Sequence, residues 1–307
     1  MSVADQVSTH LGVAIRVWAD LGSRHMWTLH RAELIDGRGI FVKASAEPTP
    51  VFTAEAAGLA WLAGTDPASA REQAADAASS TSANDVSAPA RRTELLPQVL
   101  AADDHMLVLP WLSEAGPTPE TAERFGHELA ALHAITLGQF GAPWPGWIAT
   151  LPLVNTSTNG PWSRWYAEQR LAPYLRRAAV HLGGHGIRLL ERVIEHIDTL
   201  AGPAERPARL HGDLWSGNLL WTAERVMLID PAAHGGHRET DLAMLELFGA
   251  PHLDRIRAAY HETYPLADGW RSRIPLHQLH PLLVHVVLFG AGYRAQTLDA
   301  AAAALAV

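Results

Sequence analysis

Residues 211–230 read HGDLWSGNLLWTAERVMLID, and they carry the most informative pattern in the chain. Its two short apolar runs, LLW and VMLI, flank a polar turn and are therefore expected to pair as a β-hairpin. Asn218 and Asp230 would then meet at the open end of the hairpin. Asp213 comes five residues before Asn218, in a loop that contains glycine. The pattern predicts that two carboxylates and one amide converge on one spot.

Such a set of side chains suits phosphoryl transfer. A magnesium ion that bridges phosphate oxygens takes hard oxygen ligands, which Asn218 and Asp230 can offer. A carboxylate that faces the acceptor hydroxyl, here Asp213, orients the hydroxyl and accepts its proton. H-x-D-x-x-x-x-N followed by an aspartate after a strand is the catalytic-loop pattern of kinases, with Asp-Pro-Ala here in place of Asp-Phe-Gly. Each residue alone could simply brace a loop, but the whole set at this spacing favours catalysis.

The composition limits the classes of protein that remain. A length of 307 residues is enough for two lobes with cores, and 48% of the residues are hydrophobic. A formal net charge of −8 argues against binding to the nucleic-acid backbone. The absence of cysteine removes disulfides, thiol catalysis and cysteine-ligated zinc. We see no signal peptide and no apolar run of about 20 residues, so we expect a cytoplasmic protein.

The first part of the chain, residues 1–110, predicts a small β-rich lobe. Pro110 should end the last strand, because proline has no N–H to donate to a neighbouring strand. A helix is expected over about 54–64, with Thr53 as its cap. Four short runs should form two hairpins: 33–35 with 40–43, and 98–102 with 105–109.

The remainder, residues 111–307, predicts a helical lobe, which makes the fold class α+β with two lobes. Thr118 and Pro119 form a typical helix start. Residues 66–92 are rich in Ala, Ser, Asp and Thr, and we expect them to be a disordered insertion. Further helices are expected at about 162–180, 186–200, 240–262 and 276–300.

The stretches LHGDLWSGN and LIDPAAHGGHRETDLAMLELFG resemble the fructosamine kinase, or ketosamine-3-kinase, family. That family is related to the aminoglycoside phosphotransferases and has a protein-kinase-like fold. The likeness extends over nearly the whole chain outside 66–92. It includes FVKAS near Lys43, EAAGLAWL from Glu55 and PLHQLHPLLVHVVLFG near the end. HGD with a downstream aspartate marks the wider kinase superfamily, whereas Trp-Ser-Gly-Asn and GHRETDLAM are more specific to ketosamine kinases.

The resemblance implies roles for residues outside the catalytic loop. Lys43 would hold the ATP phosphates, and Glu55 in the next helix would hold that lysine. No G-x-G-x-x-G precedes Lys43, so only the resemblance places a phosphate-covering loop at Gly22. The adenine would lie against a hinge at 107–112, where Trp111 and Leu112 keep their backbone donors. The remaining expected contacts are Leu109, Trp111 and Leu112 for the nucleotide, and Trp215, His234 and Arg238 for the acceptor.

The expected activity is phosphorylation, with ATP and Mg²⁺, of the O3 hydroxyl of a free or protein-bound ketosamine, which is a deglycation step. No nucleic acid, membrane or obligate protein partner is expected. Two alternatives stay open: a kinase for another small hydroxyl compound, such as an aminoglycoside or choline, and a non-catalytic nucleotide-binding protein. Asp241, which opens a helix, should be structural: the helix dipole favours an acid at this end, and we expect the side chain to hold the predicted catalytic loop. The scattered histidines do not predict a transition-metal site.

Overall fold

The computed structural model describes residues 2–24, 26–65 and 94–306, and the chain divides into two compact units. One unit comprises Met1–Gly116 with Leu220–Pro231, and the other comprises Pro117–Leu219 with Ala232–Val307. The first is rich in strands and the second is mainly helical, so the predicted α+β class is confirmed. The insertion expected at 66–92 lies outside the described residues.

A five-stranded sheet with the order β1-β2-β3-β5-β4 forms the first unit. Both predicted hairpins are present: Glu33 pairs with Gly39 in one, and the Asp103 carboxylate accepts the N–H groups of His105 and Met106 at the turn of the other. Pro110 is the last strand residue, as predicted. All neighbouring strands are antiparallel: β1 (Ile15–Arg24), β2 (Trp27–Leu34), β3 (Gly39–Ala44), β4 (Ala101–Ala102) and β5 (Met106–Pro110).

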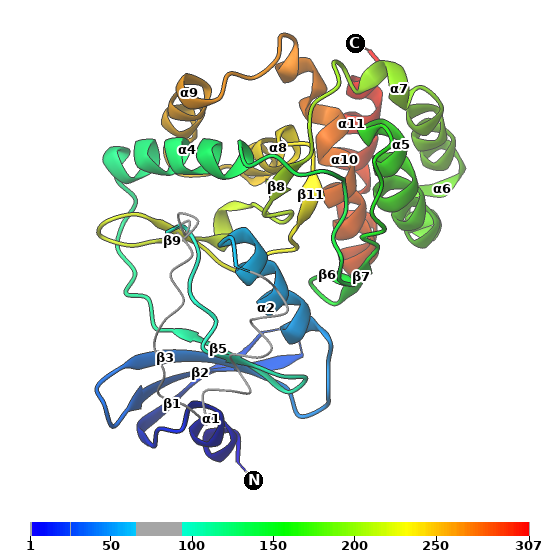
Figure 1. The fold of residues 1–307 in the computed structure, drawn as a ribbon. Coiled ribbons are helices and arrows are strands. Elements are labelled where there is room, and N and C mark those ends of the chain that lie inside the picture. The colour runs from blue at the N-terminus through cyan, green and yellow to red at the C-terminus, as the bar shows by residue number, and fades with distance from the viewer. Residues whose placement is uncertain (1, 25, 66–93, 307) are drawn as a thin grey trace. The chain divides into compact units, whose positions relative to one another are not determined.

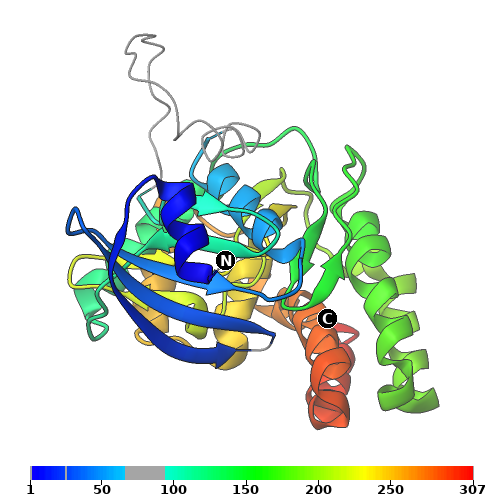
Figure 2. The ribbon, with the colours of Figure 1, turned by 90° about the horizontal axis from the view of Figure 1, so that it is seen from below.

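Two helices, α1 (Val3–Leu11) and α2 (Val51–Leu62), cover opposite faces of this sheet (Figure 1), and α1 lies in front of the strands in Figure 2. Val42 of β3 packs in the same core as Val7 of α1. Because side chains alternate along a strand, Lys43 faces the other way, toward α2.

The start of α2 differs from the prediction. The helix begins at Val51 after Pro50, and Thr53 lies inside its first turn, where its hydroxyl donates to the Pro50 carbonyl at 3.1 Å. The predicted cap at Thr53 is therefore wrong, because the helix had already begun. Gly64, with a φ of 82°, follows the end of the helix, close to the predicted limit at residue 64.

The hairpin predicted after the catalytic loop is also present, as β9 (Leu219–Trp221) paired with β10 (Val226–Leu228). It belongs to the first unit because the Trp221 carbonyl accepts the Ala115 N–H, and the Leu228 N–H donates to the Leu95 carbonyl. The first unit therefore includes a segment from later in the chain, whereas the prediction divided the chain once, after residue 110.

The second unit begins with α4 (Pro119–His133), whose cap is Thr118, as predicted. Glycines with positive φ, Gly249 and Gly290, interrupt two of the expected long helices, at 240–262 and 276–300. The other helical segments are α5 (Trp162–Tyr166), the π-helical turn η1 (Ala167–Leu171), α6 (Ala172–Glu195), α7 (Ile197–Leu200), the 3₁₀ turn η2 (Ser216–Asn218), α8 (Glu239–Phe248), α9 (Leu253–Thr263), α10 (Trp270–Phe289), the 3₁₀ turn η3 (Gly290–Tyr293) and α11 (Arg294–Ala304).

The core of the second unit lies among α5, α6, α10 and α11, with Tyr166, Leu190 and Leu282 among its buried residues (Figure 1). Two short antiparallel pairs complete the unit: β6 (Gly146–Ile148) with β7 (Leu151–Leu153), and β8 (Ala208–Leu210) with β11 (His234–Gly236). One stretch of the described residues, Trp270–Ala304, is long and apolar enough to cross a membrane by length and composition alone, which is weak evidence for a membrane span. In the most apolar part of this stretch, 50% is buried inside the protein. The core helix of a globular protein has the same length and composition.

Candidate functional site

A cluster of three charged side chains, Lys43, Glu55 and Asp230, lies in the first unit. The Lys43 ammonium donates to both carboxylate oxygens of Glu55, at 2.9 and 3.0 Å, and also to the carboxylate of Asp230. Lys43 and Glu55 are buried, whereas 34% of the Asp230 side chain is exposed. One cation therefore holds two carboxylates, and one of these carboxylates can still be reached by a ligand.

The electrostatics of this cluster keep its charges in place. Burial acts to lower the pKa of Lys43, but the charges of Glu55 and Asp230 outweigh it and raise that pKa above its usual value. Burial raises the pKa of Glu55 to about 7, although Lys43 opposes the rise. For Asp230, burial acts to raise the pKa, but the charge of Lys43 outweighs it, so the pKa is lowered. Lys43 is therefore cationic and Asp230 anionic near neutral pH.

The backbone at Asp230 is unusual. Asp230 follows β10 and has a φ of 55°, in the left-handed region that few residues other than glycine adopt. Such a conformation persists only where surrounding contacts hold it, and it is frequent at functional sites. Here the ion pair with Lys43 is one such contact.

The predicted catalytic loop, residues 211–218 in the second unit, holds Asp213 and Asn218 together. The Asn218 side-chain NH₂ donates to the Asp213 carbonyl at 2.8 Å and to the Asp213 carboxylate at 3.1 Å. Because the NH₂ group makes both of these bonds, the amide oxygen of Asn218 is left as an acceptor, suited to a hard cation. The spacing of five residues thus brings two of the predicted side chains into direct contact.

Asp241 in the first turn of α8 fixes the backbone of this loop. Its carboxylate accepts the N–H of His211 at 2.7 Å and the N–H of Gly212 at 2.9 Å, which confirms the predicted contact with the loop. His133 of α4 lies 3.2 Å from the same carboxylate and 2.9 Å from the Tyr260 hydroxyl. The sequence did not predict the role of His133, because no local pattern links it to residues so distant in the chain.

The predicted nucleotide-binding residues Gly22, Leu109, Trp111 and Leu112 all belong to the first unit. Gly22 lies in β1 near the β1–β2 turn, with a φ of 94° and an irregular strand register beside it. Leu109 is buried in β5, and the Trp111 N–H donates to the Gly39 carbonyl at 2.9 Å. This backbone donor, which we expected to be available to adenine, is therefore already used. The nucleotide contacts of these four residues stay predictions.

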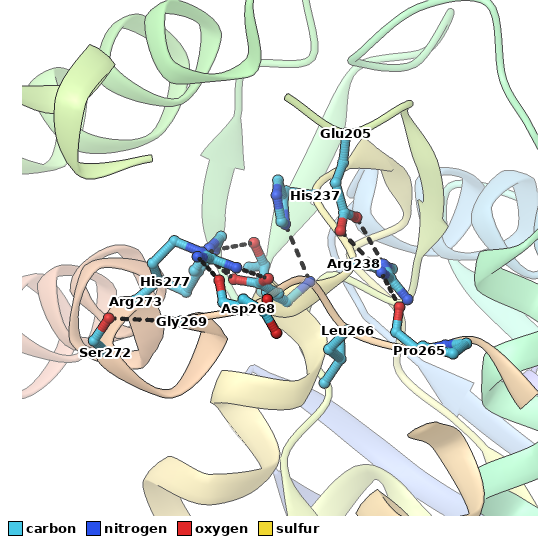
Figure 3. A network of polar contacts seen from close by, with 12 residues as sticks. Glu205, His237, Arg238, Pro265, Leu266, Asp268, Gly269, Ser272, Arg273 and His277 are labelled. Atoms are coloured by element: carbon cyan, nitrogen blue, oxygen red, sulfur yellow. Dashed lines mark hydrogen bonds and ion pairs between the residues drawn. The ribbon is translucent and has the colours of Figure 1, made fainter. Parts of the chain in front are cut away.

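The three predicted acceptor-binding residues have different surroundings. The Trp215 ring is half-buried and meets the Phe248 ring edge-on, with centroids 6.1 Å apart. His234 is buried. The Arg238 guanidinium donates to both Glu205 oxygens at 2.7 and 2.9 Å and to two backbone carbonyls (Figure 3). The contacts of Arg238 favour a structural role, while acceptor binding by Trp215 and His234 stays a prediction.

A second buried charge cluster surrounds Glu239 at the start of α8, and Figure 3 shows its members Arg273, His277 and His237. Arg273 of α10 donates to both Glu239 oxygens at 2.6 and 2.9 Å, and His277 Nε2 lies 3.3 Å from the same carboxylate. Burial acts to raise the pKa of Glu239, but the contacts with His277 and Arg273 outweigh it and lower that pKa to about 2. His237 adds a ring nitrogen, which accepts the Glu239 N–H at 3.3 Å.

The ligand atoms of His237, Glu239 and His277 lie within 4.8 Å of one another, a spacing that a metal ion could bridge. Arg273, however, occupies both carboxylate oxygens and brings a positive charge of its own. The arrangement therefore fits a closed ion-pair network better than a metal site.

Comparison with known proteins connects both units to one family. The family model described as fructosamine kinase matches residues 3–306. A probable ketoamine kinase of Thermus thermophilus is 34% identical over 253 residues, which cover 82% of each chain. The crystal structure of a chain assigned as a fructosamine-3-kinase from Thermobifida fusca is 49% identical, with a TM-score of 0.89 and coverage of 100% of this chain and 99% of that one.

More distant structures share the fold alone. An aminoglycoside phosphotransferase in complex with ADP and hygromycin B has a TM-score of 0.63 at 14% identity, with 100% of each chain covered. The predicted kinase-like fold is thereby confirmed.

Proposed function

Because the chain belongs to the fructosamine kinase family, and is therefore a phosphotransferase with ATP as donor and a hydroxyl acceptor, we propose that it phosphorylates the O3 hydroxyl of a ketosamine. The proposal rests on two groups of side chains in direct contact. In one, Lys43 bonds Glu55 and Asp230, and in the other, Asn218 bonds Asp213. The names of the relatives, ketoamine kinase and fructosamine-3-kinase, supply the acceptor class.

In the proposed reaction, Asp213 accepts the proton of the O3 hydroxyl as that oxygen attacks the γ-phosphorus of ATP. The bond from the γ-phosphorus to the bridging oxygen breaks, and ADP leaves with the electron pair. Lys43 holds the phosphate oxygens, and Glu55 fixes the direction of the lysine. Asp230 and Asn218 each offer an oxygen donor of the kind that a magnesium ion prefers, and such an ion would supply further neutralisation of the phosphate charge.

Trp215 supports the acceptor class. It comes two residues after Asp213, and its half-buried ring leaves part of the indole accessible. The C–H face of a sugar packs on an indole, and a protonated ketosamine nitrogen over the same ring gains a cation–π contact. We therefore propose Trp215 as a wall of the acceptor site.

The product chemistry suggests the biological role. A phosphate on O3 destabilises the sugar–amine adduct, so the amine is released unmodified and the step serves deglycation. We place the enzyme in the cytoplasm, since a chain without cysteine suits a reducing compartment. The proposal includes no obligate protein partner and leaves the sugar length and the amine to experiment.

A panel of acceptors tests the proposal. Purified protein with ATP and Mg²⁺ would be given five- and six-carbon ketosamines, free and protein-bound, beside the parent ketoses, aminoglycosides and choline, while ADP release is followed. We expect turnover with ketosamines and background rates with the others, and Asp213→Asn serves as the control for contaminating kinases. Turnover confined to aminoglycosides or choline would overturn the acceptor class. No acceptor-dependent ADP with any compound would overturn the kinase activity.

A further inference from the structure

A small pocket in the second unit lies against the peptide that precedes Asp213. It is lined by Arg170 of η1, His280 of α10, His234 of β11 and Gly212 of the predicted catalytic loop. Its free volume is about 10 Å³. A buried water molecule needs roughly 10–15 Å³ of such space, so the pocket takes one molecule of that size and excludes a sugar. The neighbouring aromatic walls are Trp162, Trp165 and Tyr166.

Two of the residues that line this pocket each carry a buried polar atom without a partner. Among the residues that the structure describes, Arg170 Nε and His280 Nε2 find no hydrogen-bond acceptor or donor. The two residues are only 1% and 3% exposed. The remaining nitrogens of Arg170 are used, since they donate to backbone carbonyls and, at 2.8 Å, to the Asn155 side chain. An unpaired buried polar group is costly, so both atoms point to a bound ligand.

His234 supplies a third contact of known polarity. Its Nδ1 lies 2.8 Å from the Ala232 carbonyl, which can only accept, so Nδ1 carries the proton. Burial, and then the charge of Arg170, lowers the pKa of His234 to about 3, so the ring is neutral and Nε2 keeps its lone pair. The same ring edge faces the pocket glycines: a Cβ on Gly236 would lie 3.3 Å from Nε2, and one on Gly212 would lie 3.0 Å from Cε1.

These contacts define the chemistry of the ligand. Arg170 Nε offers a proton and His234 Nε2 offers a lone pair, while a neutral His280 can present either at Nε2. A halide or another simple anion has no proton to give to His234, and a cation is repelled by Arg170. The ligand must therefore be neutral, of water size, and able to donate and accept at once.

We propose that this pocket is a binding site for one ordered water molecule, held by Arg170 Nε, His234 Nε2 and His280 Nε2. Three partners are the usual number for a buried water. The water connects η1 and α10 to β11, and all three then support the Gly212 peptide. It is therefore a positioning element for the catalytic loop, and its presence does not depend on which acceptor the enzyme uses.

Crystallography tests the water directly. In a wild-type crystal structure at about 1.5 Å resolution, we expect a single peak about 2.7–3.2 Å from each of the three nitrogens. Crystals grown or soaked in bromide should show no anomalous peak at this position. A pocket without density, or a bromide peak inside it, would overturn the proposal, the second in favour of an anion site.

His280→Phe tests for the water in solution, because the melting temperature should fall if the pocket holds water and should not fall if it is empty. If the water is present, the variant leaves Arg170 and His234 without their shared partner, and the melting temperature should fall by about 2–4 °C. His280→Gln, whose amide can still reach the water, should keep most of the stability. If no water is bound, removal of an unpartnered nitrogen and filling of the pocket would leave the melting temperature unchanged or higher, and the proposal fails.

The kcat of the variant separates a positioning role for the water from a packing role. With any acceptor that the wild type turns over, His280→Phe should lower kcat several-fold while both KM values stay within about twofold, since the loop and not a substrate contact is disturbed. His280→Gln should restore kcat. Loss of stability with kcat unchanged would limit the water to a structural role and contradict the positioning part of the proposal.

Discussion

Two buried charge clusters, one in each unit, use similar residues in different ways. In the first, Lys43 holds two carboxylates, and 34% of the Asp230 side chain is exposed. In the second, Arg273 and two histidines enclose Glu239, whose side chain is only 4% exposed. The first cluster keeps charged oxygen available to a ligand, whereas the second uses its oxygens on the protein itself.

The contrast separates a binding role from a structural one. A cluster that binds phosphate or metal must keep some of its capacity for hydrogen bonds and charge free. A cluster that only holds helices together is more stable when every group is paired. Mutations in the first cluster should therefore change activity more than stability, and those in the second should do the reverse.

The largest effect is expected from Asp230→Asn. The substitution keeps the shape of the side chain but removes the charged ligand, so kcat/KM should fall by about 10²–10³-fold. The melting temperature should fall only slightly, because the ion pair between Lys43 and Asp230 is lost but Lys43 stays paired with Glu55. Steady-state kinetics with a thermal melt checks both. If the variant lost stability but kept its activity, this cluster would have a structural role and not a binding role.

Arg273→Met should have the opposite profile. It leaves Glu239 buried without its main cation, which costs about 3–5 kcal/mol in the free energy of unfolding. The double variant Arg273→Met/Glu239→Gln removes both charges and should recover part of that loss. Denaturant unfolding measures the three stabilities. At a temperature where the variants stay folded, kcat should remain near that of wild type, and a large selective loss of kcat would link this cluster to catalysis.

The pH dependence of stability sharpens the same distinction. The pKa of Glu239 is about 2 in the folded protein, below its usual value of 4.5, so ionised Glu239 stabilises the fold above pH 4.5. That contribution, on the order of 3 kcal/mol, is lost as the pH falls from about 4.5 toward 2. Glu239→Gln should therefore flatten the decline of the unfolding free energy in this window. An unchanged slope would show that other carboxyl groups control the acid transition.

Trp215→Ala should give the smallest effect and the most selective one. Loss of a cation–π and sugar-stacking contact should raise the KM for the ketosamine by roughly 2- to 30-fold, with the KM for ATP nearly constant. Parallel titrations of the two substrates and a thermal melt measure this. If the ring serves packing instead, stability would fall by about 3–5 kcal/mol and both substrates would be affected alike.

Local patterns predicted most of the first cluster and the catalytic loop. The alternation of β3 turns Lys43 away from Val42, and a helix soon after the strand supplies Glu55. The five-residue spacing of Asp213 and Asn218 likewise closes a contact within one loop. In each case a short sequence separation or a known motif limits where the partner can be.

Long-range contacts could not be predicted in this way. The sequence gives no signal that Arg273 pairs with Glu239, 34 residues away, or that His133 meets Asp241, 108 residues away. Helix limits were also missed, because Thr53 fits the composition of a cap but the chain has already turned at Pro50. The use of the Trp111 N–H by Gly39 likewise depends on strand register, which composition does not fix.

The position of the transferred phosphate decides whether the protein is a ketosamine 3-kinase. Wild-type protein would be incubated with ATP, Mg²⁺ and a ketosamine, and the product would be analysed by phosphorus–proton correlation NMR beside an Asp213→Asn control. We predict one phosphate ester, on the C3 oxygen of the sugar, with one ADP formed for each ester. The Asp213→Asn control should be slower by about 10²–10⁴-fold. A phosphate on another oxygen, ADP release without an ester, or an Asp213→Asn variant as active as the wild type would contradict the account.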